Sequence, residues 1–301
     1  MVFDRAIDFF IIGAPKCGTT AVYNYLCEHP GVFMPQMKEP QYYASDLNVR
    51  EVRNWEAYKR LFSNAPASTL VGEASTHYLY SEVAVAAIMR DFPDSKLIVM
   101  LRNPVDASIS MHAHALTYWL EDIGDFEKAW RAQKARKDGY LLGPCAFEPK
   151  LLQYGDLFDY PPQLLRLFAN AGRHNCLIII YEEFFADPWK SYAEVQKFLG
   201  LAEHFPKSFA RVNSHREVNS RILHKFLQPN LLLGSSVEMP LRNIAHRFSI
   251  HPRRLLATWN TRSKQRNHID AKVRSELLEH FVGAVIETEA LLGKKLDVWR
   301  C

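Results

Sequence analysis

The sequence predicts an α/β fold, a single domain in which helices flank a central parallel sheet on both faces. Runs of consecutive apolar residues are typical of strands buried on both faces, and they lie at residues 8–12, 69–72, 96–101 and 175–181. Segments with a helical pattern alternate with these runs, at residues 19–28, 81–92, 104–120, 126–137, 161–170 and 189–199. Strands that alternate with helices form parallel sheets, because each crossover helix returns the chain to the same sheet edge.

One more helix is expected at residues 271–292, packed back on the sheet. Val273, Leu277 and Phe281 recur every four residues there, and Gly293 stands where a C-cap glycine belongs. Between this helix and the rest, residues 205–268 carry several prolines and arginines and show no clear period. We expect one domain over residues 1–301, in which residues 205–268 form an ordered excursion or lid.

Composition excludes several classes of protein. The chain has 301 residues, of which 48% are hydrophobic and 23% are charged, as in globular domains. Its five cysteines form neither a CxxC pair nor a disulfide framework, so we expect no structural zinc and no disulfide scaffold. No apolar stretch approaches the ~18–20 residues that span a bilayer, and no signal-peptide pattern is present. We therefore expect a cytoplasmic protein without a membrane span.

Positive charge is concentrated in one segment. The formal net charge of the chain is +4, but residues 211–268 carry eleven Lys and Arg against two Glu, so this segment is +9 and the remainder is −5. A basic stripe raises the local concentration of an anionic partner; the alternative is a solvated helix face. Because few aromatic residues interleave with these cations, we do not expect a nucleic-acid groove.

A glycine-bounded turn, Gly13 to Thr20, follows the first predicted strand and precedes the first predicted helix. Such a turn presents backbone N–H groups and the positive end of a helix dipole, which suits a phosphate. The spacing G-x-x-x-x-G is that of a nucleotide-triphosphate loop, but Thr19 occupies the lysine position and Lys16 lies inside the turn. We expect a P-loop-like phosphate cradle without the NTPase lysine; the alternative is a tight turn alone. Cys17 is expected to be a small turn residue rather than a nucleophile.

A second phosphate-type pattern follows the third predicted strand. Asn103 suits an N-cap, and Asp106 and Ser110 lie one turn apart on one face of the helix that follows. Arg102 stands at the carboxyl edge of the sheet, where doubly wound folds bind ligands. Its guanidinium can hold a phosphate bidentately beside the Ser110 hydroxyl; the alternative is an Arg102 paired with an acidic neighbour. Two phosphate-type sites on one sheet edge suggest a nucleotide with phosphates at two separate ends.

At this point four segments together resemble the PAPS-dependent sulfotransferases, closest to their bacterial and heparan-sulfate-modifying branch. They are the loop at residues 14–20, K-E-P-Q-Y-Y at 38–43, R-N-P-V-D-A-S-I-S at 102–110, and the stretch from Tyr181 to Leu201. The resemblance covers most of the chain up to Trp299 and is poor at residues 205–268. It implies in-line transfer of a sulfonyl group from 3′-phosphoadenosine 5′-phosphosulfate (PAPS) to a hydroxyl or amine. The acceptor would be a small-molecule, carrier-bound or carbohydrate compound, with no metal involved.

The resemblance also implies roles for single residues. The loop residues Lys16, Cys17, Gly18, Thr19 and Thr20 would hold the 5′-phosphosulfate of the donor. Arg102 and Ser110 fall on the pair that holds its 3′-phosphate, and Glu39 falls on the catalytic base. Arg221, with Arg216 as a second choice, lies in a segment similar to the one that closes over the nucleotide, so the excursion at 205–268 would cover the nucleotide and acceptor site.

One departure from the family leaves the base open. The heparan-modifying enzymes usually place a lysine where this chain has Ala74. His77 lies in the same strand-exit region, where cytosolic relatives use a histidine as base, so it rivals Glu39; a hydrogen-bonded structural histidine is the alternative. His112 and His114 lie on different helix faces and rank below both. We interpret Lys38 as a charge neighbour of the site or a solvated lysine.

Two other functions stay open from the sequence. A P-loop kinase or NTPase would have to explain Thr19 at the lysine position, and it predicts metal-dependent ATP binding. A non-catalytic polyanion-binding protein would act through residues 211–268 and would show strongly salt-dependent affinity. Oligomeric state does not follow from the sequence.

Overall fold

The computed structural model describes residues 5–118, 120–143, 146–206, 208–209 and 269–300, together with the backbone of residues 216–218 and 261–263. The chain divides into two compact units, one formed by residues up to 210 and from 269 onward, the other by residues 211–268. The second unit is described by two antiparallel strands, β6 (Arg216–Val218) and β7 (Thr261–Ser263). The predictions for Arg221 and for the rest of the lid lie outside the described residues.

The start of the predicted excursion at residues 205–268 packs within the first unit. The ring of Trp189 lies 5.1 Å from that of Phe205 and 4.8 Å from that of Phe209, measured between centroids. Phe209 also meets Tyr25 edge-on, at 4.8 Å. Aromatic contacts at these distances are favourable, so residues 205–209 belong to the first unit.

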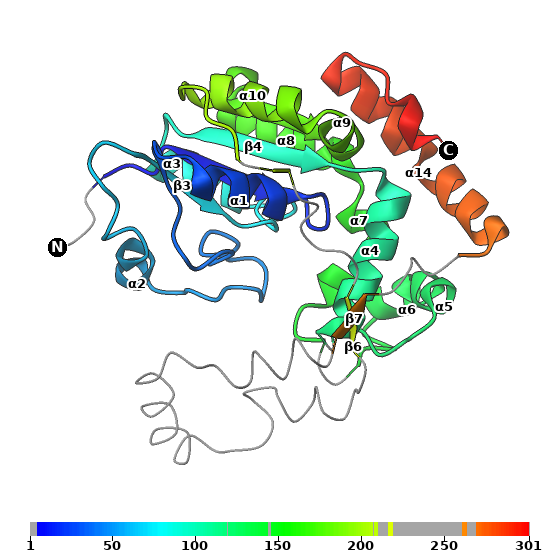
Figure 1. Cartoon of the computed structure of the whole chain (residues 1–301). Coiled ribbons are helices and arrows are strands. Elements are labelled where there is room, and N and C mark those ends of the chain that lie inside the picture. The colour runs from blue at the N-terminus through cyan, green and yellow to red at the C-terminus, as the bar shows by residue number, and fades with distance from the viewer. Residues whose placement is uncertain are drawn as a thin grey trace, which may run out of the picture. The chain divides into compact units, whose positions relative to one another are not determined.

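Five parallel strands form the central sheet, in the order β2-β3-β1-β4-β5 (Figure 1). Their bounds are β1 Phe9–Gly13, β2 Val32–Phe33, β3 Leu70–Ala74, β4 Lys96–Leu101 and β5 Cys176–Ile180. Four of them coincide with the predicted apolar runs, which confirms the parallel sheet. β1 is buried throughout, whereas Leu177 and Ile178 are only partly buried, because β5 lies at the sheet edge.

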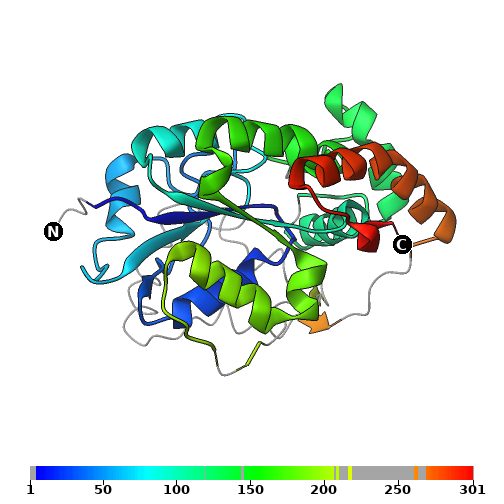
Figure 2. The ribbon, with the colours of Figure 1, turned by 90° about the horizontal axis from the view of Figure 1, so that it is seen from above.

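Helices cover both faces of the sheet, as the sequence predicts. Figure 2 shows α1 and α10 on one face and α3 and α8 on the other, and α14 packs against α8 and α4. The longer helices are α1 Thr19–Glu28, α3 Ala84–Asp91, α4 Pro104–Thr117, α8 Tyr160–Ala171, α10 Pro188–Leu199 and α14 Ala271–Leu292. The shorter ones are α2 Trp55–Arg60, α5 Phe126–Arg131, α6 Gln133–Lys137, α7 Tyr154–Leu157, α9 Tyr181–Ala186 and the 3₁₀ turns η1 Pro149–Leu152, η2 Arg173–Asn175 and η3 Asp297–Trp299.

Some predicted elements are wrong in detail. The single helix predicted at 126–137 is two helices, because Ala132 ends α5 and precedes α6. Arg136 of α6 is buried and forms an ion pair with the buried Glu121, with Arg136 Nη2 2.6 Å from Glu121 Oε1. The strand predicted at 175–181 ends one residue early, where α9 begins, and the prediction missed β2, whose two residues are too few to show a period.

A buried carboxyl on β3 makes stability depend on pH. Glu73 is fully buried, and the Tyr58 and Tyr78 hydroxyls both donate to its Oε2 at 2.8 Å. Burial raises the pKa of Glu73 to about 7, from an ordinary value of 4.5. Above pH 4.5 the unfolded chain loses this proton while the folded chain keeps it, so stability falls as the pH rises from 4.5 to about 7.

Glu73→Gln should therefore remove part of the pH dependence of stability, because an amide does not ionise. The free energy of unfolding of the variant minus that of wild type should be ~2–3 kcal/mol more favourable to the variant at pH 8 than at pH 5. Urea unfolding at the two pH values measures this difference, in which the titration of all other groups cancels. An equal difference at both pH values would mean that Glu73 is ionised in the folded protein.

Candidate active site

The carboxyl ends of β1 and β4 meet at the topological switch point of the sheet. The two strands are neighbours, yet the chain leaves β1 toward β2 and β3 and leaves β4 toward β5. The Ala14 N–H donates to the Met100 carbonyl at 2.7 Å, so the loops that follow the two strands start side by side. Open α/β sheets bind ligands at such a point, because the diverging connections leave a crevice there. Both phosphate-type motifs of the sequence lie here.

The turn after β1 needs its glycines. A Cβ on Gly13 would lie 2.9 Å from the carbonyl oxygen of Thr76. Gly18 has a φ of 93° and is the N-cap of α1, where no side chain caps the helix. The first turn of α1 also holds no acidic residue, so the positive end of its dipole is not neutralised from within the helix. Thr19 is buried in this turn and Thr20 is partly exposed.

Cys17 faces the core. Its Sγ lies 3.3 Å from the Pro15 carbonyl oxygen and 3.6 Å from the Tyr160 hydroxyl. Burial raises the pKa of the thiol to about 12, so the thiol stays protonated at neutral pH and is a poor nucleophile. Cys17 can contribute to an anion site only through its backbone.

Lys16 lies inside the turn in a left-handed conformation, with a φ of 63°, which is costly for a residue with a Cβ. Burial lowers the pKa of its ammonium group, and the nearby Glu39 carboxylate partly opposes this. Lys38 and Arg102 are close enough to lower the pKa further. Three cations therefore gather at the switch point, an arrangement that attracts an anion.

Arg102 is a buried cation with unused hydrogen-bonding capacity. It is 5% exposed, and its guanidinium lies over the Tyr181 ring, 4.5 Å from the centroid. Its Nη1 donates to the Lys16 carbonyl at a long 3.4 Å, and its Nε has no hydrogen-bond partner among the described residues. Buried guanidinium donors are normally paired, so this group is suited to a further anionic acceptor.

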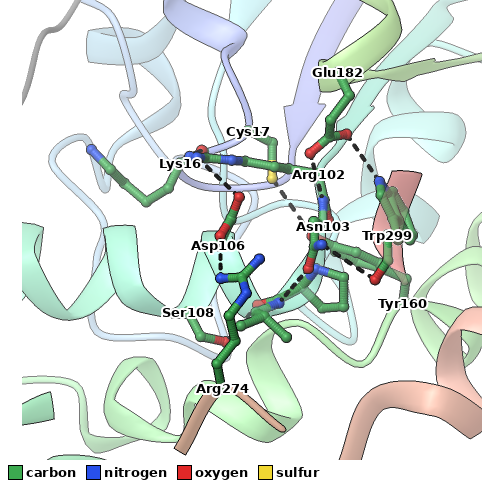
Figure 3. Close-up of polar contacts among 12 residues, drawn as sticks. Lys16, Cys17, Arg102, Asn103, Asp106, Ser108, Tyr160, Glu182, Arg274 and Trp299 are labelled. Carbon is green, nitrogen blue, oxygen red and sulfur yellow. Dashed lines mark hydrogen bonds and ion pairs between the residues drawn. The ribbon is translucent and has the colours of Figure 1, made fainter. Parts of the chain in front are cut away.

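The acidic neighbour of Arg102 is shared with another cation. Asp106 Oδ2 lies 3.9 Å from Arg102 Nη2, while Asp106 Oδ1 accepts a shorter hydrogen bond, 3.1 Å, from Arg274 Nη1 of α14 (Figure 3). The sequence left an Arg102 paired with an acidic neighbour as the alternative to a phosphate site. The pair exists, but the contact is long and Arg274 competes for the carboxylate. Ser110 lies one turn farther along α4 and is 6% exposed.

Glu39 is held close to these cations. Its backbone N–H donates at 2.8 Å to the carbonyl of Ala74, the last residue of β3. Its Oε1 accepts from Lys38 Nζ at 2.5 Å and its Oε2 accepts from Thr76 Oγ1 at 3.2 Å. Burial raises the pKa of Glu39, but the charges of Lys38 and His77 and these hydrogen bonds together hold it below its usual value. The side chain keeps 36% of its surface exposed, so the ionised carboxylate can meet a ligand.

A glutamine connects Glu39 to His77. Gln41 Nε2 lies 3.4 Å from Glu39 Oε2 and 2.8 Å from His77 Nδ1. Because a carboxylate only accepts, the amide nitrogen must face it, and His77 Nδ1 then accepts from the same nitrogen. The ring proton consequently sits on His77 Nε2, which is buried without a hydrogen-bond partner among the described residues. Burial also lowers the pKa of His77.

His114, which the sequence ranks below Glu39 and His77, is a neighbour of these groups. Burial lowers its pKa to about 3, and the charges of Lys16, Glu39 and His77 all act on it, which places its ring on α4 within electrostatic reach of the cluster. Its spacing of four residues from Ser110 was the available signal, because residues four apart share a helix face. The ring of Tyr118, one turn farther on, lies 4.5 Å from that of His114, centroid to centroid, at a tilt of 48°, and Tyr118 is 58% exposed.

The structure brings most of the predicted site residues together and does not describe one of them. The structure brings Lys16, Glu39, His77 and Arg102 together at one sheet edge, and it places Ser110 on the helix that Arg102 precedes. Arg221 lies outside the described residues. In the described part of the chain no three His, Cys, Asp or Glu side chains gather as a metal ion would require.

Comparison with known families decides between the interpretations that the geometry permits. The sequence profile described as "Sulfotransferase domain" matches residues 6–231, about three quarters of the chain. The chain belongs to the sulfotransferase domain family. The match includes Lys16, Glu39, His77 and Arg102, and it ends before α14.

Relatives of this sulfotransferase-family chain differ from it in length. It is 28% identical over 215 residues to the bifunctional heparan sulfate N-deacetylase/N-sulfotransferase 4 of Mus musculus, covering 69% of this chain and 24% of that protein. The chain therefore spans about a quarter of that relative.

Solved structures of sulfotransferases share the fold along almost the whole chain. The crystal structure of a sulfotransferase from Alicyclobacillus acidocaldarius is 25% identical, with a TM-score of 0.70 over 99% of both chains. The mouse sulfotransferase SULT7A1 complexed with PAP is 14% identical, with a TM-score of 0.50 over 93% of this chain and 84% of that one, and shows the fold alone. Among the described residues of this chain no helix is both long and apolar enough to cross a bilayer.

Proposed function

We propose that this chain is a sulfotransferase that moves the sulfonyl group of PAPS to a hydroxyl or an amine. The observation that carries the proposal is the adjacency of two cationic residues, Lys16 after β1 and Arg102 after β4, whose Nη1 lies 3.4 Å from the backbone carbonyl oxygen of Lys16. One adenosine with anionic groups on its 5′ and 3′ positions could engage both. The sulfotransferase family to which the chain belongs supports this assignment.

The described residues fit a doubly anionic nucleotide. The turn before α1 has no room for a Cβ at Gly13 and offers an uncapped helix N-terminus, which suits the 5′-phosphosulfate. Arg102, with its unpartnered Nε and its long contacts to Lys16 and Asp106, would hold the 3′-phosphate, with Ser110 beside it. When bound, the donor supplies the electrophilic sulfur and a phosphate leaving group.

Lys16 and Glu39 have the properties that sulfonyl transfer requires. Negative charge builds on the leaving oxygen during an in-line displacement, and the Lys16 ammonium would stabilise it. Glu39, ionised and partly exposed, would take the proton from the acceptor hydroxyl or amine as its oxygen or nitrogen bonds to sulfur. The charge of Glu39 acts on the pKa of Lys16, so the base and the cation that stabilises the leaving oxygen would lie in the same site.

The contacts favour Glu39 over His77 as the base. His77 Nδ1 accepts from Gln41, and Nε2 carries the proton, so neither ring nitrogen is free to receive one. Burial lowers the pKa of His77 as well, which weakens it as a base. We assign His77 the role of holding the Gln41 amide against Glu39, and His114 that of a neighbour of the acceptor.

The acceptor is proposed only by class: a small-molecule, carrier-bound or carbohydrate compound. The heparan sulfate specificity in the name of the mouse relative supports a carbohydrate. The exposed Tyr118 ring beside His114 would stack on a sugar or on another flat acceptor. The cytoplasmic location expected from the sequence stays a prediction.

Calorimetric titration tests the donor. We expect adenosine 3′,5′-bisphosphate (PAP), the product that remains after transfer, to bind at least tenfold more tightly than ATP with magnesium, because only PAP places phosphates at both cationic positions. Chelation of divalent metal should leave PAP affinity unchanged. Equal affinity for the two nucleotides, or tighter binding of ATP with magnesium, would replace this proposal with the P-loop kinase or NTPase that the sequence left open.

A further inference from the structure

The peptide group between Arg102 and Asn103 is held at both of its polar atoms. The Arg102 carbonyl oxygen accepts from the Tyr160 hydroxyl at 2.9 Å, and the Asn103 N–H donates to Glu182 Oε1 at 3.0 Å. Both residues are almost completely buried. Rotation of this peptide group would swing the Arg102 side chain, so the two hydrogen bonds fix the direction in which the guanidinium leaves the backbone.

Trp299, in η3, contacts both groups that hold this peptide (Figure 3). Its Nε1 donates to Glu182 Oε2 at 2.9 Å, and its ring lies 5.8 Å from that of Tyr160, centroid to centroid. Its carbonyl oxygen accepts from Asn103 Nδ2 at 3.3 Å. Trp299 is 1% exposed. Three contacts of different kinds therefore join Trp299 to the turn that carries Arg102 or to the groups that hold it.

The same turn is also the start of α4. Asn103 caps this helix, and its Oδ1 accepts from the Val105 N–H at 3.0 Å. The Asn103 side chain thus uses its oxygen for the helix and its nitrogen for Trp299. On the other side of the turn, Arg274 from the start of α14 holds Asp106. The segment that follows residue 268 therefore secures the Arg102 turn at two points, although it lies beyond the family match at residues 6–231.

We propose that Trp299, through Glu182, is a positioning residue for Arg102, and that it sets the selectivity of the chain for nucleotides with a 3′-phosphate. This inference rests on the proposed function. One carboxylate oxygen of Glu182 accepts a hydrogen bond from the Trp299 indole, and the other accepts one from the Asn103 N–H. Loss of the indole N–H leaves one oxygen without this partner in a partly buried place, and the carboxylate is then free to turn away from Asn103. A guanidinium that is no longer held in one direction binds a phosphate less well.

Trp299→Phe tests this assignment, because it keeps a buried aromatic ring and removes the indole N–H. The measurement is calorimetric affinity for PAP and for adenosine 5′-monophosphate (AMP), which lacks the 3′-phosphate. We expect the Kd for PAP to rise about tenfold and the Kd for AMP to stay within twofold. Glu182→Gln should behave in the same way, because its single oxygen cannot serve two donors, and it replaces Trp299→Phe if that variant does not fold.

Tyr154→Phe is the matched control, since it also removes one donor, 2.7 Å away, from a buried carboxylate, that of Glu121. We expect it to lower the Tm and to leave the ratio of PAP to AMP affinity unchanged. In an Arg102→Ala background, Trp299→Phe should have no further effect on PAP binding.

A Trp299→Phe variant that weakens the binding of PAP and AMP equally, or of neither, would overturn the positioning role. The proposed function would still stand as long as the wild-type chain prefers PAP to AMP. A wild-type chain that binds PAP and AMP equally would overturn both. An additional loss in the Arg102→Ala background would show that Trp299 acts on the nucleotide by another route, and would also overturn the assignment.

Discussion

Glu39→Gln should lower kcat by ~10²–10⁴ and leave the affinity for PAP within a few-fold of wild type. Glutamine keeps the size of the side chain and can still accept from Thr76, which now lies 3.2 Å from Oε2. It cannot accept a proton from the acceptor. Because the proton leaves the acceptor only in the reaction, the loss belongs in turnover and not in the binding of the nucleotide. Steady-state kinetics with labelled PAPS, together with calorimetry of PAP, separates the two quantities.

Two variants serve as controls for this result. His77→Asn should lower turnover less than Glu39→Gln does; a near-native rate for Glu39→Gln would move the role of base to His77.

Lys38→Met removes the cation 2.5 Å from Glu39 Oε1. Since that cation helps to hold the pKa of Glu39 low, its loss should raise the pKa. The acid limb of the pH profile of kcat should then shift to higher pH, with the plateau retained.

Lys16→Met should damage both binding and turnover, with kcat lowered by ~10² or more and PAP affinity by about tenfold. The ammonium group would meet the 5′ end of the nucleotide before the reaction and the leaving oxygen during it. Methionine has an unbranched apolar side chain only one atom shorter than that of lysine and keeps the backbone cost of a φ of 63°, so the loss can be ascribed to the charge. The measurements are again kcat with PAPS and the Kd of PAP.

The affinities of Lys16→Met and Arg102→Ala for AMP and PAP, measured side by side, show which cation binds which phosphate. Lys16→Met should weaken AMP as well as PAP, because both have a 5′-phosphate. Arg102→Ala should weaken PAP and leave AMP nearly unchanged. If both variants weakened AMP to the same extent, the two cations would form one phosphate site rather than two, and a single adenosine would no longer connect them.

Local patterns were sufficient for the elements that carry the phosphate-type motifs. α1 begins at Thr19 and β4 ends at Leu101, as the sequence predicts, because a glycine turn and an Asn-Pro pair end and begin elements by short-range sterics and capping. The short strand β2 and the break at Ala132 were missed, since β2 has only two residues and is defined by its pairing with β3, and no local pattern marks Ala132 as a helix end.

The site divides in the same way. Lys16, Glu39, His77 and Arg102 were identified by motif and resemblance, and the sheet order explains why they meet, since they follow parallel strands whose carboxyl ends share an edge. His114 was ranked below Glu39 and His77, and its nearness to the charges of Lys16 and Glu39 depends on how α4 faces the loop after β1, which no local pattern gives. The contact of Trp299 with Glu182 joins residues 117 positions apart, a separation at which no local pattern exists.

The sequence by itself determined the class of fold, the two phosphate-type turns and the family, because these depend on residue types at short and fixed spacings. Only the tertiary structure decided which oxygen and nitrogen atoms face each other. It showed that Nδ1 of His77 is engaged by Gln41, that Asp106 is shared between Arg102 and Arg274, and that Trp299 contacts the Arg102 turn. Hydrogen bonds act over about 3 Å, and distances of that order between remote residues are set by the packing of the whole unit.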